Sequence, residues 1–265
     1  MGTMLEVRDL TKRFGGFTAV DRIGFDLAEG EILGLIGPNG SGKSTTFNLI
    51  AGALPPSAGS IKLEGREIGG LSPTEVCHLG IARTYQIPRP FRKLTILENV
   101  ALAAYFGANR LISRSEAWKR AEDALTLTQL PTDPSVRVDG LGAAGLKKLE
   151  LARALATQPR LLLADESLGG LDEQEMDQAA DMLSDIRRER GITIIWVEHI
   201  MGVLMRVVDR CVVLDHGEII ATGLPQEVAH DPKVVEVYLG TDAESVQTQV
   251  AGRSAGEAAG GAAAC

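Results

Sequence analysis

The chain has 265 residues, 45% of them apolar and 23% charged, which is enough apolar material for one large domain or two small ones. Its formal net charge is −8, whereas proteins that bind nucleic acid generally carry a basic face. No run of 18 apolar residues is present, and the first residues are too polar for a secretion signal. We therefore expect a cytosolic protein that neither spans a membrane nor binds nucleic acid.

The first third of the chain predicts several strands. Segments 5–10 and 17–30 alternate between apolar and polar residues around a turn at Gly15, and 59–68 adds a third alternating segment. Between them, Glu31–Ile36 is a continuous apolar run, which is typical of a strand buried on both faces. We predict an α/β core with an antiparallel β flank.

Strand patterns then stop, and apolar residues recur at helical spacing in three further segments. These segments are 94–106, 113–130 and 146–157. We therefore predict a helical subdomain at about 88–157, inserted into an α/β domain that covers residues 4–240.

Three more apolar runs follow, each typical of a buried strand. They are Arg160–Ala164, Ile192–Val197 and Arg210–Leu214. Segment 241–265 is instead rich in Ala, Gly and Ser, with few large apolar groups that could offset the entropy lost on ordering. We expect this tail to be disordered.

The strongest motif is Gly37–Ser44, GPNGSGKS, which matches GxxxxGK[ST] between a predicted strand and a helical segment. Its glycines let backbone N–H groups face phosphate oxygens, and the following helix N-terminus adds partial positive charge. We predict that Lys43 reaches the β- and γ-phosphates of ATP and that the Ser44 hydroxyl binds Mg²⁺. The predicted nucleotide-binding residues are Gly37, Pro38, Asn39, Gly40, Ser41, Gly42, Lys43, Ser44 and Thr45.

A second element suits the same chemistry. The apolar strand LLLA ends in Asp165 and Glu166. An aspartate at a strand end can hold Mg²⁺, and the adjacent glutamate can act as the general base for the attacking water. The alternative is an ordinary buried strand that leaves the sheet into an acidic loop.

Together with these two motifs, the order of several further segments between about Leu5 and Gly240 resembles the ATP-binding cassette (ABC) family. The resemblance implies a P-loop fold with a RecA-like core, an antiparallel β flank and an inserted helical subdomain. It implies that Phe14 stacks on adenine, unless it is a core side chain, and that Gln86 contacts Mg²⁺ and the attacking water, unless it is a solvated loop residue.

The same resemblance assigns a D-loop to Gly170, Leu171 and Asp172, although Asp172 could equally be a helix cap. It assigns His199, at the end of the segment ITIIWVEH, to contact with the γ-phosphate, although a lone histidine is usually structural. The implied catalytic residues are therefore Glu166, His199 and Gln86, and the implied metal-binding residues are Ser44, Gln86 and Asp165.

Within that family the chain resembles the ATPases of prokaryotic uptake systems for branched-chain, hydrophobic amino acids. The segments RFGGFTAVD, ARTYQIPRPFRKLTILENV, KKLELARALATQP, VEHIM and EVYLG carry this resemblance. It implies a peripheral protein on the cytoplasmic face of the inner (plasma) membrane. Its implied partners are a second ABC ATPase subunit, in a heterodimer or a homodimer, transmembrane permease subunits and, indirectly, a solute-binding protein.

One segment departs from the family pattern Leu-Ser-Gly-Gly-Gln. The corresponding residues are Leu141, Gly142, Ala143, Ala144 and Gly145. Gly142 lacks the hydroxyl expected to bond the γ-phosphate, and Ala144 places a methyl group where bare backbone should approach phosphate. The change leaves open a regulatory subunit that hydrolyses ATP poorly. Apart from this change, two further alternatives are a cassette for another cargo, such as an amide, urea or lipid, and a soluble ABC ATPase outside transport.

Overall fold

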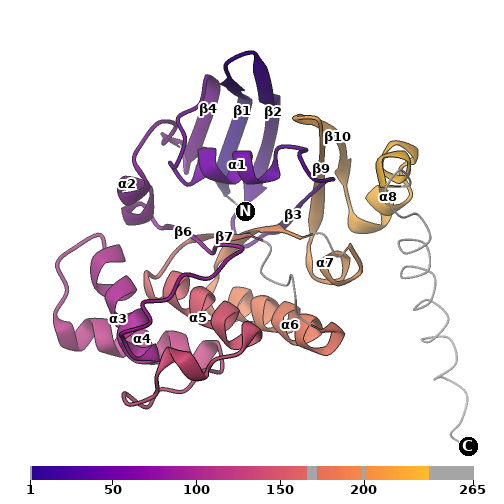
Figure 1. The fold of residues 1–265 in the computed structure, drawn as a ribbon. Helices are drawn as coiled ribbons and strands as arrows, with labels where there is room; N and C mark the ends of the chain where they lie inside the picture. Colours follow the sequence, from indigo (N-terminus) through magenta and orange to yellow (C-terminus); the bar gives the residue numbers. More distant parts are fainter. Residues whose placement is uncertain (1, 166–171, 199–200, 239–265) are drawn as a thin grey trace, which may run out of the picture.

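The computed structural model describes residues 2–165, 172–198 and 201–238 and shows a mixed α/β molecule (Figure 1). The strands are β1 (Thr3–Phe14), β2 (Phe17–Ala28), β3 (Ile32–Ile36), β4 (Ala58–Leu63), β5 (Arg66–Glu67), β6 (Ile81–Arg83), β7 (Leu161–Asp165), β8 (Thr193–Val197), β9 (Arg210–Asp215) and β10 (Glu218–Gly223). The helices are α1 (Lys43–Ile50), α2 (Pro73–His78), α3 (Ile96–Gly107), α4 (Arg114–Leu127), α5 (Ala143–Ala156), α6 (Glu173–Arg190), α7 (Met201–Val207) and α8 (Pro225–Ala229), with a short 3₁₀ turn at Val138–Gly140.

The central sheet has six strands in the order β10-β9-β3-β8-β7-β6. The strands from β9 to β6 run parallel, and β10 pairs with β9 in the antiparallel direction. Both faces are covered, because Leu33 and Leu35 of β3 pack into one hydrophobic core while Ile32 and Ile36 pack into the other. A parallel sheet buried on both faces explains the continuous apolar runs in the sequence.

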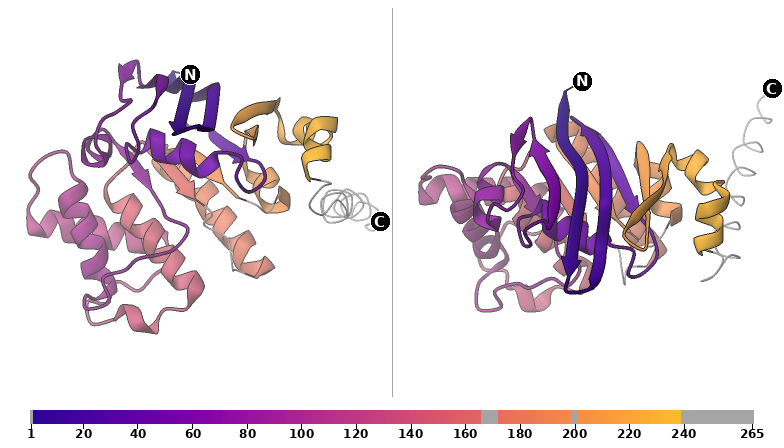
Figure 2. Two further views of the ribbon diagram at one scale, coloured as in Figure 1. Left: turned by 45° about the horizontal axis from the view of Figure 1, so that its top comes forward. Right: turned by 90° about the horizontal axis from the view of Figure 1, so that it is seen from above.

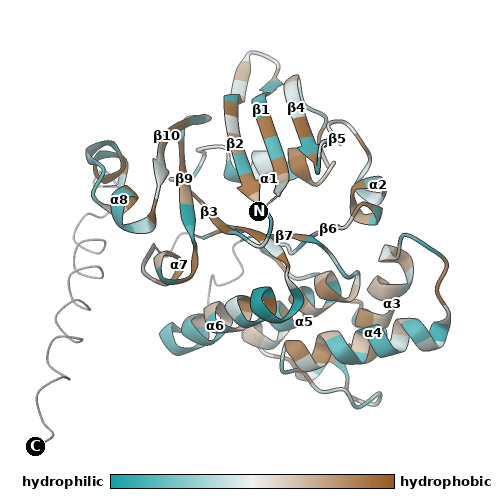
Figure 3. Cartoon of the chain, turned by 180° about the vertical axis from the view of Figure 1, so that it is seen from behind, coloured by the Kyte–Doolittle hydropathy of each residue, from teal (hydrophilic) through white to brown (hydrophobic). Residues whose placement is uncertain are grey.

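A second, antiparallel sheet has the order β2-β1-β4-β5 and lies above the central sheet, with α1 between them (Figure 1). Its inner residues, such as Leu5, Val7 and Ile61, share a core with Phe47 of α1. We call this the strand-side core. Apolar and polar residues alternate along β1, β2 and β4 (Figure 3), so one face of this sheet is buried and the other faces solvent.

Helices α3, α4, α5 and α6 gather on the opposite face of the central sheet, in what we call the helix-side core (Figure 2). Their starts follow from capping chemistry: Thr95 caps α3 and Ser113 caps α4, each accepting a hydrogen bond from the backbone N–H three residues later. Gly191, in the left-handed conformation, ends α6.

The structure confirms the expected α/β fold, with the predicted strands shifted by one residue at most at several ends. It adds elements that sequence patterns did not predict, notably β6 and α6. The tail predicted for 241–265 lies outside the described residues. Within the described residues, every helix is too short or too polar to cross a bilayer.

Candidate nucleotide site

The phosphate loop begins where β3 ends, at the carboxyl edge of the central sheet, where α/β proteins bind their ligands. Two of its glycines are required by their surroundings. A Cβ at Gly37, where φ is +151°, would lie 2.1 Å from the carbonyl oxygen of Leu214. A Cβ at Gly42, where φ is +106°, would lie 2.7 Å from the carbonyl oxygen of Ala19. The loop backbone is therefore held against β9 and β2 with no space for side chains.

The loop closes around the side chain of Lys43, the first residue of α1. Lys43 is 5% exposed, and its Nζ donates hydrogen bonds to the carbonyl oxygens of Gly37 at 2.7 Å and Pro38 at 2.9 Å. Ser44 and Thr45 follow in the first turn of α1, where backbone N–H groups lack helical acceptors. Asn39 and Gly40 form the exposed tip of the loop. A buried ammonium group beside open helix amides is suited to phosphate.

Asp165 ends β7, two strands from β3, and its side chain is 7% exposed. Its Oδ2 accepts a hydrogen bond at 2.5 Å from Nη2 of Arg83, whose Nη1 donates to Oδ1 of Asn48 on α1 at 2.6 Å. The backbone N–H of Asp165 donates to Oγ1 of Thr84 at 3.1 Å. One guanidinium therefore joins the predicted metal-binding aspartate to the phosphate-loop helix.

Two further candidate residues, Gln86 and Phe14, lie on the surface. Gln86 is exposed and follows β6 directly after Tyr85, whose side chain is 56% exposed. Phe14 ends β1 and is 47% exposed, with Nζ of Lys12 5.2 Å from its ring centroid. The alternative interpretation of Phe14 as a core residue is therefore wrong, and its ring is accessible for stacking.

The altered signature lies at the start of α5, in the helix-side core, on the opposite face of the central sheet from α1. Gly142 is the N-cap residue of α5 and provides no side-chain cap, which a serine at this position would supply. Leu141 packs against the helix-side core, while Ala143 is exposed and Ala144 and Gly145 are partly exposed. The segment therefore lies apart from this chain's own phosphate loop.

Four predicted residues, Glu166, Gly170, Leu171 and His199, lie outside the described residues. Asp172, also assigned to the D-loop, is the N-cap of α6: its Oδ1 accepts from the N–H of Glu175 at 2.8 Å, and Glu175 returns a bond to the N–H of Asp172. This capping box agrees with the helix-cap interpretation of Asp172.

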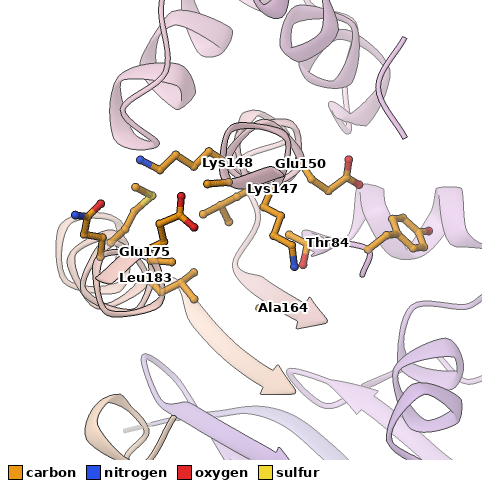
Figure 4. A pocket seen from close by; sticks show the side chains of 13 residues that line it. Thr84, Lys147, Lys148, Glu150, Ala164, Glu175 and Leu183 are labelled. Carbon is orange, nitrogen blue, oxygen red and sulfur yellow. The ribbon is translucent and has the colours of Figure 1, made fainter. Parts of the chain in front are cut away.

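A cavity of about 120 Å³ separates the signature helix α5 from α6 and the end of β7. Its walls include Thr84, Ala144 and Ala164, which adjoin the Gln86 loop, the altered signature and Asp165 respectively. Lys147 extends from α5 toward Thr84, whereas Lys148 points the other way (Figure 4). Helix α5 is thus incompletely packed against α6 and the end of β7.

Sequence reasoning missed Arg83 and Asn48. An arginine that ends a three-residue strand and an asparagine within an apolar helix have no sequence signature, because their significance comes only from the residues they meet. The capping box of α6, with Asp172 followed three residues later by Glu175, was a signal that could have located that helix.

Comparison with known families agrees with this geometry. A family model described as "ABC transporter" matches residues 20–169, which include the phosphate loop and Asp165. A second family model, described as "Branched-chain amino acid ATP-binding cassette transporter", matches residues 218–244.

Individual relatives cover nearly the whole chain. It is 34% identical over 249 residues to the high-affinity branched-chain amino acid transport ATP-binding protein LivG of Salmonella typhimurium, covering 89% of this chain and 98% of LivG. It is 34% identical over 253 residues to the corresponding protein BraF of Pseudomonas aeruginosa, again covering 89% and 98%. A probable LivG of Archaeoglobus fulgidus is 31% identical over 256 residues, covering 93% and 99%.

Two solved structures are similar at the level of the whole fold. The ADP conformation of MJ1267, an ATP-binding cassette of an ABC transporter, has a TM-score of 0.82 and 30% identity, covering 91% of this chain and 100% of that one. The dimeric post-hydrolysis state of the cassette MJ0796, bound to ADP and Pi, has a TM-score of 0.75 and 27% identity, covering 84% and 99%.

Proposed function

Because the chain belongs to the ABC transporter family of ATP-binding proteins, we propose that it is the ATP-hydrolysing subunit of an importer for branched-chain or other hydrophobic amino acids. The observation that carries this proposal is the phosphate loop closed around Lys43, with Asp165 attached to the same helix through one arginine. The relatives named for branched-chain amino acid transport support the cargo class.

The residues present fit Mg²⁺, whose ligands are oxygen atoms. Ser44 supplies a hydroxyl in the first turn of α1 and Asp165 supplies a carboxylate, and Mg²⁺ usually takes one or two carboxylates together with phosphate oxygens and water. A bound Mg²⁺ would neutralise charge that develops on the phosphates. We assign its binding to Ser44 and Asp165, with Gln86 on the exposed side of the site.

ATP binding then rests on this chain's own groups. The ammonium of Lys43 is enclosed by the loop, so binding exchanges its bonds to two loop carbonyls for bonds to phosphate. The exposed ring of Phe14 stacks on adenine. Glu166 orients and deprotonates the attacking water, and His199 contacts the γ-phosphate; together we expect the two residues to contribute roughly 10²–10⁴-fold to the rate.

The site is completed by a second ATPase subunit. Since Leu141–Gly145 lies on the other face of the sheet from the phosphate loop, this segment serves the nucleotide of the partner, and the partner's signature serves Lys43. The similar cassette MJ0796 is a dimer in its post-hydrolysis state. We propose a heterodimer, with Asp172 at the end of its D-loop facing the partner.

Permease subunits dock beside the Gln86 loop. Three apolar side chains there are exposed, Tyr85 at 56%, Ile87 at 68% and Phe91 at 48%. Exposed aromatic and aliphatic groups on one short segment are typical of a protein interface. The interface would hold this subunit on the cytoplasmic face of the inner (plasma) membrane, where the permease receives its cargo from a solute-binding protein.

The decisive experiment is reconstitution of this chain with its neighbouring permease, second ATPase and solute-binding protein in liposomes. We expect uptake of radiolabelled leucine, isoleucine or valine that requires ATP on the side of the membrane that carries the ATPase subunits. Uptake of urea or a short amide in place of these amino acids would reassign the cargo but retain the ATPase. Nucleotide binding without hydrolysis in the complete complex would instead make the chain a regulatory subunit.

A further inference from the structure

Arg83 bonds both Asp165 and Asn48 beside the site, although neither the family resemblance nor the sequence motifs give it a role. Its side chain is 9% exposed. Besides its bonds to Asp165 and Asn48, its guanidinium lies 5.6 Å from the ring centroid of Phe47 and 5.1 Å from that of Tyr85. The guanidinium therefore contacts two aromatic rings and two hydrogen-bond acceptors.

The contacts connect three parts of the nucleotide site. Phe47 and Asn48 belong to α1, which starts at Lys43, so their positions are fixed relative to the phosphate loop. Asp165 ends β7. Tyr85 starts the exposed segment that leads to Gln86. Arg83 itself pairs with Leu163 of β7 in the parallel register, so its backbone is fixed to the strand that presents Asp165.

An arginine suits this place for a physical reason. Its planar guanidinium donates along fixed directions, so the bond from Nη2 to Oδ2 and the bond from Nη1 to Asn48 cannot both form unless the carboxylate of Asp165 and α1 hold one relative orientation. Removing the guanidinium would leave Asp165 buried without its charged partner, free to choose another rotamer.

We propose that Arg83 is a positioning residue for the metal, which by holding Oδ2 of Asp165 keeps that carboxylate in the orientation in which it would bind Mg²⁺. The inference rests on the proposed function, because it assumes that Asp165 binds Mg²⁺. The positive charge of Arg83 repels a nearby cation, but its bonds to Asp165 and Asn48 partly offset that repulsion. Loss of the fixed orientation of Asp165 would act on the metal ligand itself, so we expect removal of Arg83 to weaken metal binding. Partners of metal ligands typically change metal affinity by about 10–100-fold when removed.

The test is Mn²⁺ affinity of the purified chain with saturating ADP, measured by electron paramagnetic resonance of free Mn²⁺. Arg83→Gln should weaken Mn²⁺ binding about tenfold, while the affinity for ADP in EDTA stays within about twofold, since the loop and Lys43 are unchanged. Arg83→Lys keeps the charge but cannot donate to Asp165 and Asn48 in the same geometry, and should give an intermediate loss.

Two further variants separate the explanations. Arg160 lies just before β7 and bonds Glu64. Arg160→Gln therefore removes another arginine near the same strand and should leave Mn²⁺ affinity unchanged. Asp165→Asn tests the underlying site: if it does not weaken Mn²⁺ binding, the proposed metal ligand is wrong, whatever Arg83 does.

Unchanged or tighter Mn²⁺ binding in Arg83→Gln, with Asp165→Asn weakened, would overturn the role of Arg83 and leave the proposed function intact. Equal losses of Mn²⁺ and metal-free ADP affinity would also overturn it, since they would indicate a general structural role. If Arg83→Gln does not fold, Arg83→Lys decides by the same criterion.

Discussion

At the scale of single residues, the ammonium group of Lys43 carries the most specific chemistry in the site. The phosphate loop encloses this group, and the carbonyl oxygens of Gly37 and Pro38, to which it donates, belong to that loop. Such preorganised charge is worth most where water is excluded. The same enclosure makes the residue a sharp test of the site.

We expect Lys43→Ala to lose ATP binding or productive closure, at a cost of several kcal/mol, because a desolvated positive charge on the phosphates is removed. Nucleotide affinity can be measured by titration with a fluorescent ATP analogue. Lys119→Ala, on the exposed face of α4, is the matched control and should bind normally. Normal transport by Lys43→Ala would contradict the assigned phosphate site.

Gly37 allows a second residue-scale prediction, about stability. Gly37→Ala would place a Cβ 2.1 Å from the carbonyl oxygen of Leu214, so backbone must shift, and we expect a loss of roughly 1–3 kcal/mol in the free energy of unfolding. Gly16→Ala is the control, because within the described residues no atom lies within 4 Å of a Cβ there. Urea denaturation of both variants gives the comparison, and equal midpoints would show that the loop backbone is not constrained by β9.

At the scale of elements, the segment between β6 and α3 connects the nucleotide site to the helical half. Thr84 is bonded to β7 on one side, while Nη1 of Arg153 on α5 donates to the carbonyl oxygen of Arg89 at 3.2 Å on the other. We therefore expect a movement of α5 to be passed to the exposed residues that we assign to permease docking.

Charge reversal tests that assignment. Arg89→Glu changes an exposed side chain but leaves the backbone bond from Arg153 in place, so it should weaken coupling of ATP hydrolysis to transport and spare ATP binding. Arg92→Glu should behave similarly, although it also loses the ion pair with Asp139. Lys62→Glu on β4 is the control. If Arg89→Glu instead lowers nucleotide affinity, the docking surface has been misplaced.

At the scale of the whole molecule, the altered signature predicts two unequal nucleotide sites in a heterodimer. The phosphate loop, Asp165, Glu166 and His199 of this chain would form the working site if the partner has an intact signature. The other site, capped by Leu141–Gly145, would turn over slowly, because a hydroxyl and a close backbone contact worth about 1–3 kcal/mol each are missing.

We therefore expect Glu166→Gln to stop transport almost completely and the matching substitution in the partner to cost much less. ATP hydrolysis by the reconstituted complex measures both. Restoring the signature with Gly142→Ser and Ala144→Gly should raise turnover at the slow site, and the serine fits, since among the described residues no atom lies within 4 Å of a Cβ at Gly142. Equal losses from the two glutamate substitutions, or vigorous turnover by a homodimer of this chain, would disprove the asymmetry.

The sequence by itself determined the features that are written in neighbouring residues. The phosphate loop is contiguous, and its glycines, lysine and serine act through local backbone geometry, so Gly37–Ser44 could be read directly. Buried strands and amphipathic helices are likewise recorded as apolar runs and periodic patterns. The α6 helix was missed because its sequence is mostly polar, and β6 because three residues are too few to form a pattern.

Only the tertiary structure decided which distant residues meet. Arg83 is 35 positions from Asn48 and 82 positions from Asp165, yet its guanidinium bonds both. The three residues meet because parallel pairing brings β6 beside β7 and packing brings α1 over these strands. The exposure of Phe14 was also settled there, by its place at the end of β1. The separation of Leu141–Gly145 from the phosphate loop was settled by the central sheet, whose two faces bury different cores. Long-range packing of this kind leaves no local signal, since each residue's neighbours in space are chosen by the whole fold.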